Sequence, residues 1–177
     1  MRSFFSKSSV QRVVVTAFAL MFSMISYAQN LWISSHLPAR NCVTESTISH
    51  KVGFLADDMC EGRGTGTRGA VEAAAWIVRQ FEKSRLLKHK GSYYHKFQTA
   101  KGVCGTNVVG FLPGGTKTSR SKYVIVGAHF DHLGKINGVI YPGADSNASG
   151  TAAMLSLAEM FSAMRYCGKV WDSNIIF

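Results

Sequence analysis

The sequence has few acidic residues, few prolines and no long hydrophobic run. Ten Asp and Glu residues stand against twenty Lys and Arg residues, so the formal net charge of the 177-residue chain is +10. With three prolines, no internal repeat and no low-complexity tract, nothing marks a linker between domains. The longest apolar run, residues 13–25, is shorter than the roughly 20 residues that span a bilayer. These absences favour one globular domain without a stable membrane anchor.

The N-terminal 28 residues have the composition of a secretory signal. Arg2, Lys7 and Arg12 provide a basic start, the apolar run follows, and Ser26-Tyr27-Ala28 has the small-x-small pattern of a cleavage site. We therefore predict a signal peptide over residues 1–28 and a mature domain over residues 29–177. The protein is expected to be exported, to the periplasm or the extracellular space.

The chain lacks any C-x-x-C pair, which argues against a zinc site made of cysteines. Its four cysteines are Cys42, Cys60, Cys104 and Cys167. An even number of cysteines in an exported chain permits disulfides, in three alternative pairings. Buried free thiols account for them equally well, because a domain of this size does not require cross-links.

Two patterns suggest other ligands, but their contexts are unfavourable. Lys and Arg side chains alternate with aromatic residues over 79–101, as in surfaces that bind nucleic acid. A solvated helix end and loop explain them better, because export separates the protein from nucleic acid. Residues 64–69 fit the G-x-G-x-x-G pattern of dinucleotide-binding loops, but no strand precedes them. We expect neither a nucleic-acid partner nor a dinucleotide, and interpret 64–69 as a flexible lead into a helix.

The hydrophobic patterns alternate between helix and strand. Helical spacing of apolar residues predicts helices over 70–87 and 148–164, and a short helix is expected over 48–55. Short apolar runs predict strands over 106–112 and 123–128, and another strand begins at residue 174. The order predicts an α/β fold with a mixed, mostly parallel sheet and helices on both faces. The strand at 123–128 is accordingly expected to be buried, and Ser146 or Asn147 is expected to cap the last helix.

Polar residues with metal-binding chemistry follow the strand at 123–128. His129 and Asp131 project to the same side of an extended chain, so Asp131 can accept the imidazole N–H that a metal does not use. Asp145 precedes a helix, whose dipole favours the ionised carboxylate that binds cations. The spacing predicts a metal site near the carboxyl end of this strand. His132 is interpreted as a loop residue, and Tyr141 and Asn147 as residues that shape the site.

These motifs give the chain a specific resemblance. H-F-D-H-L-G at 129–134 and I-Y-P-G-A-D-S-N-A-S-G-T-A-A-M-L at 140–155 resemble the signature of the co-catalytic dizinc aminopeptidases, the bacterial leucyl aminopeptidase type related to glutamate carboxypeptidase. Residues 55–58, 61–66 and 106–114 are also similar to that family, so the likeness covers most of 48–177. The resemblance implies a zinc exopeptidase-like fold, with His129 binding one of two zinc ions, Asp145 bridging both, and Asp131 orienting His129 as part of the catalytic machinery.

The resemblance further implies an exported zinc aminopeptidase that acts on peptide substrates. That family uses an adjacent Glu-Glu pair and further Asp and His ligands downstream of a strand similar to 174–177. We therefore expect the chain to be the N-terminal part of a catalytic domain, incomplete at its C-terminus, and to lack peptidase activity by itself. The alternative is a non-catalytic fragment or interaction protein derived from the same family.

Overall fold

The structure is a computed structural model that describes residues 16, 18–27, 42–116 and 122–177. The chain divides into two compact units, Met1–Leu37 and Pro38–Phe177. In the first unit, residues 18–27 are helical and expose large apolar side chains such as Phe18 and Phe22. The predicted cleavage site after Ala28 lies outside the described residues. Among the described residues, no helix is long and apolar enough to cross a membrane.

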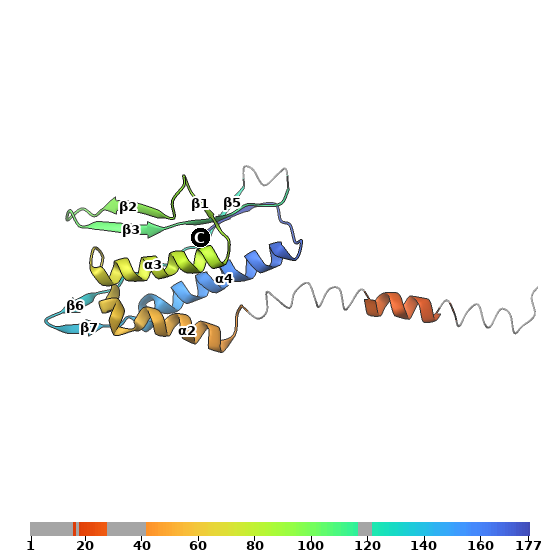
Figure 1. Ribbon diagram of the computed structural model, residues 1–177, viewed down its shortest axis with the longest axis horizontal. Coiled ribbons are helices and arrows are strands. Elements are labelled where there is room, and N and C mark those ends of the chain that lie inside the picture. The colour runs from red at the N-terminus through yellow and green to blue at the C-terminus, as the bar shows by residue number, and fades with distance from the viewer. Residues whose placement is uncertain (1–15, 17, 28–41, 117–121) are drawn as a thin grey trace, which may run out of the picture. The chain divides into compact units, whose positions relative to one another are not determined.

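The second unit combines three long helices with short strands (Figure 1). The helices are α2 (Glu45–Ala56), α3 (Arg68–Lys83) and α4 (Ser149–Tyr166), with a 3₁₀ segment η1 (Asp58–Arg63) and a wide-turn segment η3 (Ala144–Ala148). The strands are β1 (Leu87–Lys88), β2 (Tyr94–Gln98), β3 (Cys104–Val108), β4 (Gly110–Leu112), β5 (Tyr123–Ile125), β6 (Gly134–Ile136), β7 (Val139–Tyr141) and β8 (Asn174–Ile176).

Local capping explains where the helices begin. Thr44 and Thr47 form a reciprocal capping box at the start of α2, with N–O distances of 3.2 and 3.0 Å. The Thr67 hydroxyl accepts the Ala70 N–H at the start of α3. At α4, the side-chain oxygen of Asn147 accepts the Gly150 N–H at 3.0 Å, although the residue that directly precedes α4 is Ala148. The predicted capping role of Asn147 is therefore present one residue earlier than a regular N-cap position.

The largest sheet has the order β1-β4-β8-β5. β5 pairs with β8 in parallel, whereas β4 pairs with β1 and β8 in antiparallel orientation. β2 and β3 form a separate antiparallel pair, as do β6 and β7. The mixed α/β class is as predicted, but the parallel part of the four-stranded sheet is limited to β5 and β8. In Figure 1 the helices α2, α3 and α4 all lie on the same side of this sheet, not on both sides as predicted.

The strand expected to be buried differs most from prediction. β5 covers only Tyr123–Ile125 and lies at an edge of the sheet, and Ile125 is 75% exposed. The apolar run predicted the strand and its parallel pairing correctly. It could not show which faces other elements cover, because a β-branched run is equally compatible with an edge strand. The strand predicted over 106–112 is divided into β3 and β4, which pair with different partners.

The core lies between the helices and the sheet. Ile77 and Phe81 of α3, Leu155 of α4 and Ile175 of β8 are at most 5% exposed. Burial of each such side chain contributes about 1.5–3 kcal/mol to folding. The predicted stripe on the helix after residue 70 is thus confirmed at its central positions. Ala148, just before α4, belongs to this core, and Val126 and Ala128, just after β5, pack against it, so the core holds these two segments relative to each other.

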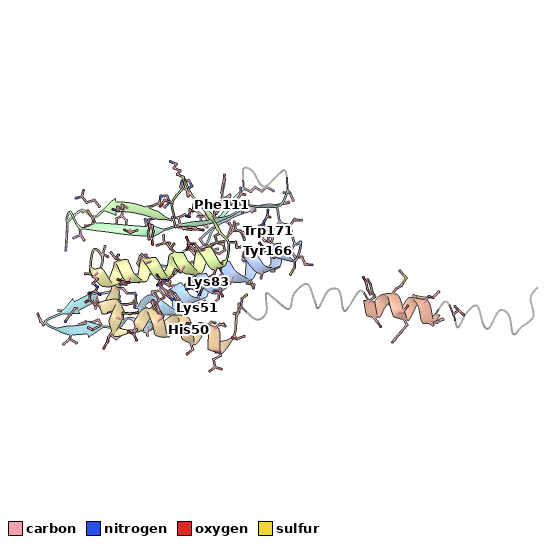
Figure 2. The ribbon with its side chains drawn as sticks, in the orientation of Figure 1. His50, Lys51, Lys83, Phe111, Tyr166 and Trp171 are labelled. Carbon is pink, nitrogen blue, oxygen red and sulfur yellow. The ribbon has the colours of Figure 1, made fainter. Side chains whose placement is uncertain are left out.

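α2 is joined to α4 by a buried ion pair. Lys51 is 5% exposed and its ammonium lies 2.9 Å from a carboxylate oxygen of Glu159. Figure 2 labels Lys51 beside the exposed His50 on α2. Cys60, Cys104 and Cys167 are not joined by disulfides, but of these three only Cys60 is buried and the other two are exposed. The alternative of buried free thiols therefore holds for Cys60.

Candidate metal centre

The candidate metal centre is built from two loops. We call residues 126–132, which follow β5, the histidine loop, and residues 142–148, which precede α4, the aspartate loop. The histidine loop begins at Val126, whose N–H donates to Ile176 O at 2.8 Å and continues the pairing with β8 beyond Ile125. Beyond that bond the chain leaves the sheet and carries His129 past its edge. This is the place at which α/β sheets present ligand-binding groups.

His129 and Asp131 lie together as predicted. The His129 Nδ1 atom is 3.1 Å from the Asp131 carbonyl oxygen and 3.5 Å from its carboxylate Oδ1. Their side chains are 59% and 45% exposed, so a ligand or ion can reach them. Because Asp131 faces Nδ1, Nε2 on the opposite side of the ring is left for a metal. The shorter of the two contacts is to the backbone carbonyl, so the carbonyl and the carboxylate of Asp131 both orient the His129 ring.

Asp131 is itself held by a residue that the sequence interpretation did not use. The hydroxyl of Thr65 donates to the second carboxylate oxygen, Oδ2, at 2.5 Å. Thr65 belongs to the segment 64–69, which fits the sequence pattern of a dinucleotide-binding loop. In the structure this segment instead contacts the histidine loop, because Thr65 binds Asp131 and Gly64 forms a β-bridge with His132.

The aspartate loop is tied to the histidine loop through backbone acceptors. Asn147 and Thr151 both donate to the carbonyl of His129, at 3.3 and 3.1 Å. Asp145 lies two residues before Asn147, in η3, and is exposed. Gly143, which precedes η3, has a φ of 59°, and a Cβ there would lie 2.5 Å from Cγ of His132. His132 thus packs against the aspartate loop and is more than a solvated loop residue.

Arg63 is a central residue of the site that the sequence did not reveal. It is fully buried, and its guanidinium donates to Phe130 O in the histidine loop and to Pro142 O and Gly143 O in the aspartate loop. Burial lowers the pKa of this guanidinium below its usual range, while the charges of Cys60 and Asp131 act in the opposite direction. Arg63 lies in the family-like segment 61–66, but local spacing could not reveal its role, because its partners in these loops are 67 to 80 residues away.

An imidazole and carboxylates are a donor set that zinc accepts. His129 Nε2 and the Asp145 carboxylate are the atoms that would hold an ion, with Asp131 supporting the imidazole. No group of three or more His, Cys, Asp or Glu side chains arranged to bind a metal occurs among the described residues. The residues fit part of a zinc site, and a complete site needs further ligands.

A cavity of about 530 Å³ opens beside the histidine loop. Thr65, His129 and Asp131 line it together with apolar side chains such as Phe97, Ile125 and Phe177. Its volume is in the range of small-molecule sites, and its lining combines an apolar wall with a few polar groups. A ligand in this cavity would lie against the His129–Asp131 pair.

Comparison with known proteins agrees with this geometry. Residues 107–177, which carry His129, Asp131 and Asp145, match the family model described as Peptidase family M28. This part of the chain is therefore similar to the peptidases of family M28. The chain is also 36% identical over 90 residues to a probable leucine aminopeptidase of Arthroderma otae, a match that covers 48% of this chain and 22% of that protein. The resemblance to aminopeptidases expected from the sequence is thereby confirmed.

Solved structures share the fold. LapA and LapB of Legionella pneumophila align with TM-scores of 0.57 and 0.56 at 18% and 21% identity, each over 81% of this chain and 36% of theirs. The glutaminyl cyclase of Fimbriiglobus ruber aligns with a TM-score of 0.55 at 19% identity, over 75% of this chain and 43% of its own. The mixed α/β fold class is confirmed by these structures. The chain spans less than half the length of each of these proteins.

Proposed function

We propose that this M28 segment is part of a zinc-dependent aminopeptidase that releases N-terminal residues from peptides. The observation that carries the proposal is the pairing of His129 with Asp131 at the end of β5, beside a loop that presents Asp145. The match of residues 107–177 to family M28 and the relative named as a probable leucine aminopeptidase support it. Asp131 and the two proposed ligands are the residues predicted from the sequence.

The residues of this chain would bind the metal ions and orient the groups that hold them. His129 Nε2 would bind one ion, and the Asp145 carboxylate would bridge two. Asp131 would hold the His129 ring in the tautomer that carries hydrogen on Nδ1 and stabilise its orientation. Two bound zinc ions would lower the pKa of a bound water and polarise the peptide carbonyl. The cavity beside the histidine loop would receive the apolar side chain of the substrate's first residue.

The test is metal binding by the purified 177-residue chain, measured by calorimetry with Zn²⁺. His129→Ala and Asp145→Asn should each reduce the affinity at least about ten-fold, because each removes one of few ligands. His50→Ala and Asp58→Asn are matched controls, since both residues are exposed and lie on other elements. Equal Zn²⁺ affinity in His129→Ala and the unchanged chain would refute the proposed site.

Catalysis is tested separately with a leucyl anilide. The described part of the chain lacks a complete ligand set, so we expect the 177-residue chain alone to release leucine slowly or not at all. The alternative function, a non-catalytic interaction protein, is favoured by the exposed apolar side chains of β5. Zinc-dependent turnover by the 177-residue chain would exclude that alternative.

We also propose that the protein is exported and that residues 1–28 are removed. The basic and apolar parts of this segment support the proposal, as does the division of the chain into one unit over Met1–Leu37 and another over Pro38–Phe177. Mass spectrometry of the protein recovered from a bacterial host should give a mature N-terminus at residue 29. An intact N-terminus on exported protein would contradict the cleavage.

A further inference from the structure

The buried Arg63 connects three segments that are distant in sequence. Its Nε donates to Phe130 O at 2.6 Å, its Nη1 to Pro142 O at 2.7 Å, and its Nη2 to Gly143 O at 2.8 Å. Nη1 also donates to Leu55 O near the end of α2. One rigid, planar group therefore joins α2, the histidine loop and the aspartate loop.

The acceptors of Arg63 are close to the proposed ligands along the chain. Phe130 follows His129 directly, and Gly143 precedes Asp145 by two residues. Two residues of chain span at most about 7 Å, so a fixed Gly143 carbonyl strongly limits where Asp145 can lie. The same guanidinium thus sets the position of both proposed ligands.

The backbone around Arg63 strengthens this connection. The Arg63 carbonyl accepts the N–H of His132 at 3.1 Å, so Arg63 binds the histidine loop through its side chain and its main chain. Gly62 allows close packing, because a Cβ there would lie 2.4 Å from Gly134 O and 2.6 Å from Tyr141 O. The segment 62–65 is therefore a rigid support beneath the site, not the flexible lead into a helix that the glycines suggest.

The charge of Arg63 is compensated by carbonyl dipoles. Among the described residues, Arg63 forms no ion pair, and the groups that accept its hydrogen bonds are four backbone oxygens. Burying a cation costs free energy unless its N–H donors all have acceptors. The hydrogen bonds of Arg63 therefore depend on the geometry of its donors. Lysine can supply the charge but not the planar fork that reaches acceptors in different directions.

We infer that Arg63 is a positioning residue of the proposed metal centre, which holds His129 and Asp145 at the separation that allows them to bind the same ions. This inference rests on the proposed function. Arg63 would contact neither metal nor substrate, and would act only through the two loops. Loss of its hydrogen bonds should leave both ligands present but poorly placed.

The test compares Arg63→Lys with Lys51→Met in the full chain. Lys51 is the other buried cation in the part of the chain that the structure describes, but its ion pair with Glu159 joins α2 and α4 and involves neither loop. Both variants should lower the melting temperature. With Co²⁺ as the probe, only Arg63→Lys should reduce metal affinity, by about ten-fold or more, and change the visible absorption of the bound ion. Unchanged affinity and spectrum in Arg63→Lys would overturn the inference.

A second measurement uses the unchanged chain and so does not depend on the stability of a variant. The amides of His132 and Ala148 donate to Arg63 O and Gly143 O, at 3.1 Å each, and report on the two loops. If Arg63 joins the loops, native-state hydrogen exchange should give both amides the same free energy of opening and the same dependence on denaturant. Independent opening of the two amides would overturn the inference. Joint opening in a chain that binds no Co²⁺ would instead refute the proposed function.

Discussion

The hydroxyl of Thr65 donates a 2.5 Å hydrogen bond to the carboxylate of Asp131, whose other oxygen lies 3.5 Å from His129 Nδ1. Thr65 is thus the first member of a chain of contacts that ends on the imidazole. Each contact restricts the next group, so the orientation of His129 depends on a residue 64 positions earlier in the sequence. Outer groups of this kind commonly influence metal affinity.

Thr65→Val keeps the shape of the side chain and removes its donor. Because Asp131 is half exposed, water can replace part of the lost bond, so we expect a loss of stability of about 1 kcal/mol. The Zn²⁺ affinity should fall by a factor of about 3 to 10, measured by calorimetry. Thr44→Ala is the control, because it removes the cap of α2 at a similar cost of about 1 kcal/mol without touching the site. A similar fall in affinity in both variants would show that stability, not orientation, is responsible.

Two glycines should respond to alanine in opposite directions. A Cβ on Gly69 would lie 1.8 Å from the Cys60 carbonyl oxygen, so Gly69→Ala should destabilise the fold by about 3 kcal/mol or more. A Cβ on Gly53, within α2, meets nothing within 4 Å, so Gly53→Ala should stabilise it by about 0.5–1 kcal/mol. Urea unfolding followed by circular dichroism measures both. Destabilisation by Gly53→Ala would contradict the helical environment assigned to it.

Periodicity was sufficient to predict the helices. Apolar spacing located α3 and α4 to within a few residues, because one face of each packs against the core. The β6–β7 hairpin was missed, although its turn Asn137-Gly138, with φ values of 51° and 83°, is a strong hairpin signal between short apolar segments. The burial of β5 could not be predicted, because it depends on which elements cover the sheet.

The chemistry of the site was predictable only where it is local. His129 and Asp131 are two residues apart, so their contact follows from strand geometry. Arg63 and Thr65 contact residues more than 60 positions away, and their roles depend on how the loops meet in the fold. The glycines beside them suggested a flexible segment, whereas the structure uses glycine there for close packing against Gly134.

Tyr93 should make stability depend on alkaline pH. Its hydroxyl donates to Leu86 O at 2.5 Å, and burial, with a smaller effect of the Glu82 charge, raises its pKa above the ordinary value of 10.0. The unfolded chain therefore releases the proton at lower pH than the folded chain. The contribution of Tyr93 is fully present below about pH 10 and is lost as the pH rises through the folded-state pKa.

Tyr93→Phe removes this titration together with the hydrogen bond. The variant should be less stable than the unchanged chain at pH 8, and the difference should shrink as the pH rises above 10. Urea unfolding at a series of pH values measures both effects. A stability difference that stays constant from pH 8 to pH 11 would show that the pKa of Tyr93 is the same in the folded and unfolded chain.

The Lys51–Glu159 pair predicts a strong asymmetry between single and double substitutions. Lys51→Met leaves the partly buried Glu159 carboxylate without its partner, so unfolding free energy should fall by about 3 kcal/mol. Adding Glu159→Leu removes the unpaired charge and should recover most of that loss, because an apolar pair of similar volume can replace a buried ion pair. Urea unfolding of the two single variants and the double variant gives the coupling energy. Additive losses would mean that the two side chains do not stabilise each other, and that α2 is held on α4 by apolar contacts alone.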